Sequence, residues 1–122
     1  MTVVLDASAI LAFVQGEDGA DTVEHALVSG ACCSAVNWSE VAQRVLAAGR
    51  DWDLVRSLLV AHRVRVEPVE LDDAEWAARS WQRGEDLSLA DRLCLALGER
   101  LDGEVLTADA AWGDAGRIRQ IR

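Results

Sequence analysis

Two short stretches of the sequence decide the fold: VVLDAS at residues 3–8 and VLTAD at residues 105–109. Each begins with apolar residues typical of a buried strand and ends in polar residues, with Asp6 in the first and Asp109 in the second. In an α/β protein, the crevice that binds ligands forms beyond the carboxyl ends of the strands. We therefore expect both acids at one edge of a sheet.

Two further acids, Glu40 and Asp91, lie between these stretches, each near the start of a predicted helix that follows a loop. Four carboxylates do not remain together as bare anions, because two of them ~5 Å apart repel by roughly 3 kcal/mol at an effective dielectric constant of ~20. Either some take up protons or divalent cations bind. Oxygen ligands suit Mg²⁺ or Mn²⁺, and a carboxylate site with two such ions points to hydrolysis of phosphodiester bonds.

Each acid also has a purely structural explanation. Asp6 is a suitable N-cap for the helix that follows it, and Asp109 is a suitable cap for the turn after the last buried strand. Glu40 is spaced to pair with Arg44 one helical turn on, a contact worth only ~0.3–0.5 kcal/mol. Asp91 is the hardest to explain in this way, because leucines flank it along its own side of the helix.

The composition predicts one globular domain spanning residues 1–122, since 51% of the residues are hydrophobic and 27% are charged. The longest apolar run, residues 7–14, is too short to cross a bilayer, and no basic-then-apolar leader opens the chain. We therefore expect a cytoplasmic protein without membrane association. The three cysteines, Cys32, Cys33 and Cys94, are expected to be small buried residues rather than disulfides or zinc ligands.

The net charge of −9 argues against a simple nucleic-acid-binding surface, which would be basic. An acidic protein can still cut nucleic acid if metal ions neutralise its active centre. All twelve basic residues are Arg, and the absence of Lys argues against a receiver domain or an aspartyl-phosphate hydrolase. Four arginines are candidates for contacting phosphates, although Arg also serves every ordinary surface position: Arg44, Arg50, Arg83 and Arg92.

Hydrophobic periodicity predicts strands alternating with helices, which implies parallel strands with helices on both faces. The expected strands are residues 2–6, 31–35, 63–69, 104–107 and 118–121. The expected helices are residues 8–15, 20–29, 38–48, 51–62, 72–83 and 89–101, with a short turn at 110–112. We expect Asn37, Asp72 and Ser88 as helix caps, Pro68 at an edge or a strand end, and Arg92 on the solvated side of its helix.

Four motifs, in this order and with this spacing, resemble the PIN-domain family: VLDASA at 4–9, Asn37-x-x-Glu40, LSLADRxCLAL at 87–97 and LTADxxW at 106–112. Within that family, the chain is most similar to the ribonuclease toxins of VapBC-type toxin–antitoxin pairs. The resemblance implies a three-layer α/β/α fold with a five-stranded, mostly parallel sheet. It also implies endonucleolytic cleavage of RNA with Mg²⁺ or Mn²⁺.

The resemblance assigns catalytic and metal-binding roles to four acids: Asp6, Glu40, Asp91 and Asp109. It gives site-shaping or substrate-positioning roles to Ser8, Asn37 and Thr107. It further implies a homodimer and a VapB-like antitoxin whose C-terminal segment covers the crevice. Because the crevice is anionic, we predict that this antitoxin inserts an Arg or Lys near the four acids, while an apolar helix covers exposed surface beside them. Trp38 belongs either to that contact surface or to the core. His25 and His62 lie away from every motif and are expected to be structural or solvated. The alternative function is a non-catalytic PIN-fold binding module, against which the intact set of four acids argues.

Overall fold

The computed structural model describes residues 2–122 and is built around a sheet of five strands, with every neighbouring pair parallel. The strands are β1 (Val3–Leu5), β2 (Ala31–Ser34), β3 (Arg65–Glu67), β4 (Glu104–Thr107) and β5 (Ile118–Gln120). Their order across the sheet is β3-β2-β1-β4-β5. The chain thus adds β2 and β3 on one side of β1, and then adds β4 and β5 on the other side of β1. The crevice at such a switch point is where open α/β sheets bind ligands.

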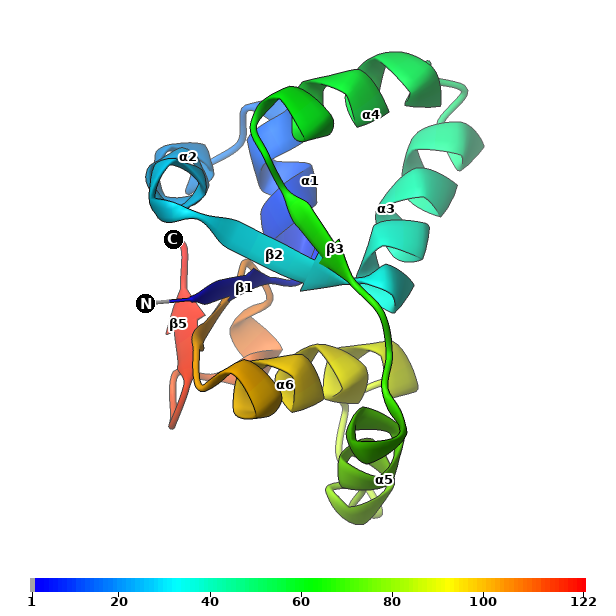
Figure 1. The fold of residues 1–122 in the computed structure, drawn as a ribbon, viewed down its shortest axis with the longest axis vertical. Helices are drawn as coiled ribbons and strands as arrows, with labels where there is room; N and C mark the ends of the chain where they lie inside the picture. The colour runs from blue at the N-terminus through cyan, green and yellow to red at the C-terminus, as the bar shows by residue number, and fades with distance from the viewer. Residues whose placement is uncertain (1) are drawn as a thin grey trace.

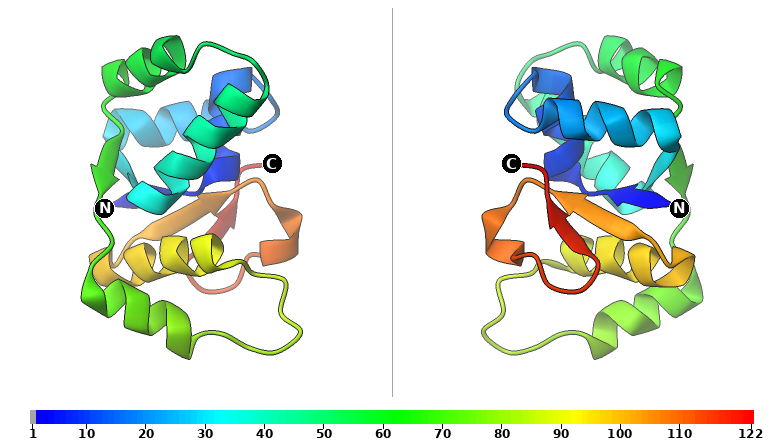
Figure 2. Two further views of the ribbon diagram at one scale, coloured as in Figure 1. Left: turned by 90° about the vertical axis from the view of Figure 1, so that its right-hand side faces the viewer. Right: turned by 90° about the vertical axis from the view of Figure 1, so that its left-hand side faces the viewer.

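Helices cover both faces of this sheet, as the sequence predicts (Figures 1 and 2). The helices are α1 (Ala7–Gln15), α2 (Ala20–Ser29), α3 (Ala35–Ala47), α4 (Trp52–Ala61), α5 (Leu71–Arg79) and α6 (Leu89–Leu101), with a 3₁₀ turn η1 (Ala110–Trp112). The first four lie on one side of the sheet, and α6 lies on the other with α5 packed against it (Figure 2). The three-layer α/β/α architecture is therefore confirmed.

Side chains along the strands alternate between two cores, because successive residues of a strand point to opposite faces. The core against α6 contains Val4, Cys32, Cys94, Leu97 and Val105. The core against the first helices contains Leu5, Ile10, Cys33, Val41 and Leu106. The adjacent Cys32 and Cys33 consequently belong to different cores. All three cysteines are free and buried, which confirms the expectation that they act as small apolar residues.

The predicted caps of two helices are wrong. α3 begins at Ala35 rather than Trp38, because Ser34 caps it by accepting a hydrogen bond from the backbone N–H of Val36 at 3.2 Å. Asn37 therefore lies inside the first turn of α3. α5 begins at Leu71 with Glu70 as its N-cap, whereas the sequence suggested Asp72, and it ends at Arg79 instead of continuing to residue 83. The cap of α6, Ser88, is confirmed.

The expected position of Arg92 on a solvated face is also wrong. Its side chain is half-buried, and its Nη1 donates a hydrogen bond to the carbonyl oxygen of Ala77 at 2.6 Å. Arg92 thereby joins α6 to α5, a contact that helical periodicity alone does not reveal. Pro68 follows directly after β3, which is an edge strand, as predicted. Within residues 2–122, no helix has the length and apolar character required to cross a membrane.

Candidate active site

The four acids singled out in the sequence come together in the structure. Asp6 follows β1, Asp109 follows the end of β4, Glu40 lies in α3 and Asp91 lies in the first turn of α6. All four line one cavity of about 120 Å³, together with Ala7, Ser8, Leu11 and Arg44. Segments separated by up to a hundred residues of chain therefore deliver carboxylates to the same crevice, at the carboxyl ends of the two central strands.

Asp6 is the most deeply buried of these acids, with only 4% of its surface exposed. It is the N-cap of α1, and its Oδ1 accepts a hydrogen bond from the backbone N–H of Ala9 at 2.7 Å. Its Oδ2 accepts a hydrogen bond of 2.5 Å from the hydroxyl of Thr107, and Ser8 donates to the same carboxylate at 2.7 Å from Oδ1. The structural explanation of Asp6 is therefore correct, and it coexists with a place in the cavity.

Burial raises the pKa of Asp6 from its ordinary 3.8 to about 6. Loss of hydration disfavours the carboxylate, and this outweighs the hydrogen bonds from Thr107, Ala9 and Ser8, which favour it. The nearby charge of Asp91 raises the pKa further. The ionised form of Asp6 is thus held at an energetic cost, which a cation in the cavity would offset.

Two hydroxyl groups connect Asp6 to the loop after β4. Ser8 Oγ accepts a hydrogen bond from the backbone N–H of Ala108 at 2.9 Å, and Thr107 Oγ1 accepts one from the N–H of Asp109 at 3.0 Å. The two hydroxyl oxygens lie 3.2 Å apart. Because both hydroxyls also donate to Asp6, they fix its carboxylate relative to Asp109.

Asn37 holds Glu40 in place. Its side chain is 1% exposed, and its Nδ2 donates to Oε1 of Glu40 at 2.8 Å and to the carbonyl oxygen of Ala90 at 3.4 Å. Within residues 2–122, the buried Oδ1 of Asn37 has no hydrogen-bond partner. The pairing of Glu40 with Arg44 that the spacing allows is not among the ion pairs that the described residues form.

Asp91 and Asp109 each use part of their carboxylate to cap a helix. Asp91 Oδ2 accepts a hydrogen bond from the N–H of Ser88 at 3.0 Å, and Ser88 Oγ accepts one from the N–H of Asp91 at 3.1 Å. We did not predict this reciprocal capping box from the sequence, although the Ser-x-x-Asp spacing is typical of it. Asp109 Oδ1 accepts from the N–H of Ala111 at 2.9 Å at the start of η1.

The donor atoms around the cavity are those of a hard-cation site, because its acidic side chains offer only oxygen and no His or Cys lines it. In the conformation described for residues 2–122, no three Asp, Glu, His or Cys side chains are close enough together to hold a metal ion. The cavity therefore presents the ligands without a finished coordination shell. Side-chain rotations would have to accompany metal binding.

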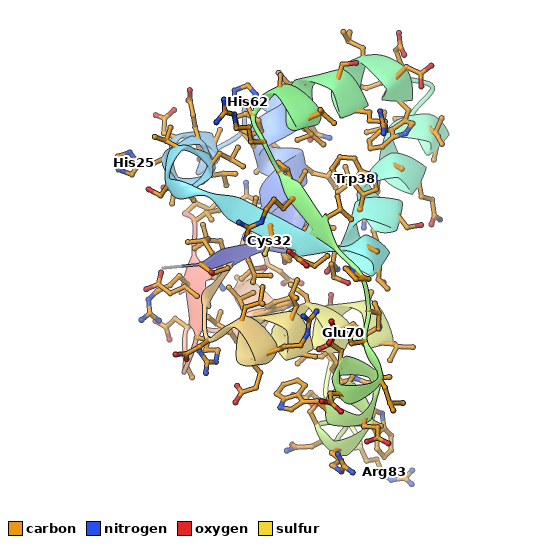
Figure 3. The ribbon with its side chains drawn as sticks, in the orientation of Figure 1. His25, Cys32, Trp38, His62, Glu70 and Arg83 are labelled. Atoms are coloured by element: carbon orange, nitrogen blue, oxygen red, sulfur yellow. The ribbon has the colours of Figure 1, made fainter. Side chains whose placement is uncertain are left out.

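The other candidate residues lie elsewhere. Trp38 is half-buried and packs edge-to-face on Trp52, with ring centroids 5.4 Å apart, so it belongs to the periphery of the core. Arg83 lies at the far end of the molecule, over the ring of Trp81 (Figure 3). The Nδ1 of His62 donates a hydrogen bond to the carbonyl oxygen of Leu58 at 2.9 Å, which fits the structural role expected for this residue.

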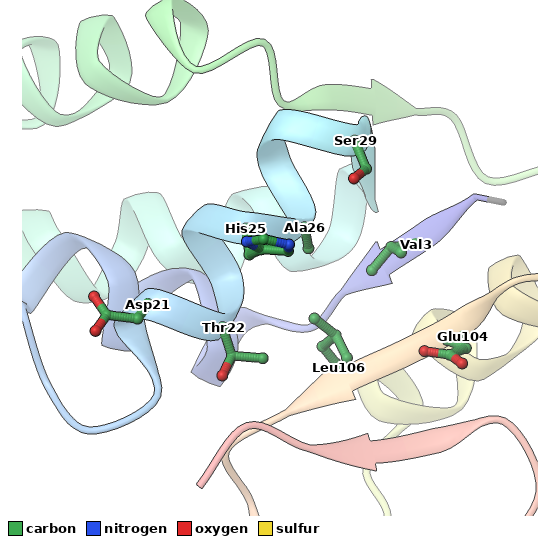
Figure 4. A pocket seen from close by; sticks show the side chains of 8 residues that line it. All are labelled: Val3, Asp21, Thr22, His25, Ala26, Ser29, Glu104 and Leu106. Carbon is green, nitrogen blue, oxygen red and sulfur yellow. The ribbon is translucent and has the colours of Figure 1, made fainter.

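A larger cavity, of about 540 Å³, lies between α2 and the strands β1 and β4 (Figure 4). His25 lines it from the helix, and Val3 and Leu106 line it from the sheet. None of the four acids of the candidate active site contributes to its lining. Its size alone does not make it the functional site, because its residues bring no cluster of convergent polar groups comparable with the carboxylates.

Comparisons with known proteins agree with this fold. Residues 3–118 match a family model described as the PIN domain.

A toxin–antitoxin complex from Klebsiella pneumoniae contains a chain with 16% sequence identity and a TM-score of 0.79, with 98% of each chain covered. VapC20 of Mycobacterium tuberculosis, described as a toxin that cleaves the sarcin–ricin loop, has 20% identity and a TM-score of 0.70, over 94% of this chain and 95% of that one. A DNA-bound VapBC complex from Salmonella typhimurium has 16% identity and a TM-score of 0.75, over 100% and 99%. No curated protein sequence matches the chain.

Proposed function

The chain belongs to the PIN-domain family, and from this premise we propose that it is a metal-dependent endoribonuclease, the toxin of a toxin–antitoxin pair. The observation that carries the proposal is the convergence of Asp6, Glu40, Asp91 and Asp109 on one cavity. The solved structures with the same fold support it, since they include toxin–antitoxin complexes and a toxin described as cleaving the sarcin–ricin loop.

The residues present fit Mg²⁺ or Mn²⁺ as the cofactor. The carboxylates provide oxygen ligands, and the ionised form of Asp6 is disfavoured by burial until a positive charge compensates it. The buried, unpartnered Oδ1 of Asn37 is one more polar atom beside Glu40. When bound, such an ion lowers the pKa of a water molecule and stabilises negative charge that develops on a phosphate.

The protein's own contribution is to hold the acids in place before the substrate arrives. Thr107 and Ser8 fix Asp6, Asn37 fixes Glu40, and the capping box with Ser88 fixes Asp91. Groups held in this way need only the rotations that metal binding requires, and little further reorganisation as charge develops, which favours electrostatic catalysis. No His or Lys lines the cavity, so proton transfer from water falls to the carboxylates or to solvent.

The experiment that tests this function is cleavage of total RNA by the purified protein with Mg²⁺ or Mn²⁺ and with a chelator. We expect cleavage only with metal, and a loss of about 100-fold or more in Asp91→Asn. The matched control is Asp72→Asn, an exposed acid on α5 that is remote from the cavity lining. A protein that binds RNA without cutting it under any of these conditions would instead be the non-catalytic binding module.

The partner that we propose is a small antitoxin, because the solved relatives include complexes with one. Exposed apolar side chains on α3 and α4 suit the docking of an apolar helix: Leu46, Leu54, Leu58 and Val60. The acidic cavity suits an Arg or Lys of the antitoxin, since the guanidinium fork pairs with carboxylates. Replacing the basic residues of the co-purified antitoxin one at a time should restore cleavage for at least one of them. If none does, inhibition comes from occlusion alone.

We also propose that the chain forms a homodimer, as the family resemblance implies. Sedimentation equilibrium of the purified toxin measures this directly. A monomer at concentrations that support cleavage would contradict the proposal.

A further inference from the structure

Arg44 occupies an unusual place for a basic residue. It lies in α3, one helical turn after Glu40, and lines the same cavity as the four acids. Nevertheless, no carboxylate of residues 2–122 forms an ion pair with it. Glu40, its neighbour on the helix, is engaged by Asn37 instead. Arg44 thus brings a positive charge to the edge of an acidic site, and this charge is not paired with the carboxylates there.

A second cavity, of about 390 Å³, adjoins the acidic one. Ser8, Leu11 and Arg44 line both cavities, so Arg44 stands at the point where they meet. The second cavity continues past Gln15 to Arg122. We call this second cavity the arginine groove, defined by Ser8, Leu11, Gln15, Glu17, Arg44, Ala48, Ala108 and Arg122.

The charge changes sign between the two cavities. Four acids and one Arg line the first, whereas two Arg and the single acid Glu17 line the arginine groove. Arg122 is held there by a hydrogen bond from its Nη1 to the carbonyl oxygen of Asp18 at 3.3 Å, which leaves its other N–H groups available. The excess of positive charge in the arginine groove contrasts with the net charge of −9 of the whole chain.

We propose that the arginine groove carries the RNA backbone away from the scissile bond, with Arg44 contacting the phosphate next to the acidic cavity and Arg122 contacting one further along. This proposal rests on the ribonuclease function proposed above. The planar guanidinium matches two phosphate oxygens at once, so both residues act by positioning the substrate. A bound metal ion would neutralise the acids, so the guanidinium of Arg44 would remain unpaired and free to contact the substrate.

The groove also explains how an acidic protein holds a polyanion. The overall charge repels RNA, so attraction must come from local features. The other arginines of comparable exposure lie apart from both cavities, among them Arg56 on α4. Arg44 and Arg122 supply a local positive charge that attracts the RNA backbone beside the site where the scissile phosphate must be placed.

The test measures RNA binding and cleavage for Arg44→Gln, Arg122→Gln and the control Arg56→Gln. Binding of a fluorescein-labelled single-stranded RNA of mixed sequence is followed by anisotropy with Mg²⁺, each substitution being made in the Asp91→Asn background so that the probe stays intact. Because each phosphate contact to a single strand contributes about 0.7 to the slope of log affinity against log salt, each groove substitution should lower that slope by about 0.7. Affinity should fall about tenfold for each, and Arg56→Gln should match its parent.

Cleavage by the same three variants with Asp91 intact provides the second measurement. The KM should rise more than kcat falls for Arg44→Gln and Arg122→Gln, because their contacts hold the substrate before reaction. If the wild type cleaves RNA and both groove variants match Arg56→Gln in salt slope and KM, the groove proposal is overturned while the ribonuclease function stands. If the wild type neither binds nor cleaves RNA, both fall. Circular dichroism of the variants excludes unfolding as the cause.

Discussion

Replacing Asp6 by Asn should stabilise the metal-free protein at neutral pH. The side chain is buried, and its pKa is raised from 3.8 to about 6, chiefly because it loses hydration. Asn has nearly the same shape and carries no charge. Its amide oxygen can accept from the N–H of Ala9, and the hydroxyls of Ser8 and Thr107 can turn to accept from its amide nitrogen. The substitution therefore removes the charge and keeps most of the hydrogen bonds.

The size and sign of the effect follow from the raised pKa of Asp6. Between pH 3.8 and about 6 the unfolded chain has released the proton of Asp6 while the folded protein still holds it. The free energy of unfolding of the wild-type protein therefore falls as the pH rises, and the fall is complete above the pKa of Asp6 in the folded protein. A rise from 3.8 to about 6, at ~1.4 kcal/mol for each pH unit, gives about 3 kcal/mol. The advantage of Asp6→Asn over the wild type should grow by about that amount between about pH 4 and about pH 7.

Urea unfolding of both proteins in a chelating buffer over this pH range measures the difference. The titrations of groups that do not interact with Asp6 are common to both proteins and cancel. Asp72→Asn, an exposed acid on α5, serves as the control and should show no comparable trend. An advantage of Asp6→Asn that does not change with pH would refute the reasoning, because it would mean that burial does not penalise the Asp6 carboxylate.

Three further outcomes are expected. Mg²⁺ or Mn²⁺ at about 100 times its Kd should add about 2.7 kcal/mol to the wild-type stability, roughly 10 °C in Tm, in a thermal melt; no shift would count against the metal site. Thr107→Val removes the donor to Asp6 and the acceptor for the N–H of Asp109, so urea unfolding near pH 7 should show a loss of about 1–3 kcal/mol, whereas Thr107→Ser retains both contacts. Gly103→Ala places a Cβ against the backbone carbonyl of Thr2 and should reduce stability by about 1–3 kcal/mol in the same assay; an unchanged midpoint would show that the backbone yields freely.

The sequence alone determined which segments form strands and helices and where the acids fall. Apolar runs and helical periodicity are local signals, so the five strands and six helices could be placed within a few residues of their observed positions. Asp6 and Asp109 follow strands that pair in parallel, so their meeting at one edge follows from topology. Where local signals competed, the outcome was missed: Ser34 and Asn37 are both good caps for α3, and only packing selects Ser34.

The tertiary structure decided how each of these side chains is used. Burial raises the pKa of Asp6, and the hydrogen bond from Thr107, which lies about a hundred residues away in the sequence, lowers it in part. Tertiary packing also places the side chain of Arg92 on the carbonyl oxygen of Ala77 instead of in solvent. It likewise brings Arg44 and Arg122 to the lining of one cavity, the arginine groove. Charge and hydrogen bonding act through space over a few ångströms. Residue spacing along the chain specifies such neighbours only within one helix or turn, so the partners of these groups emerge only when the helices and strands are packed together.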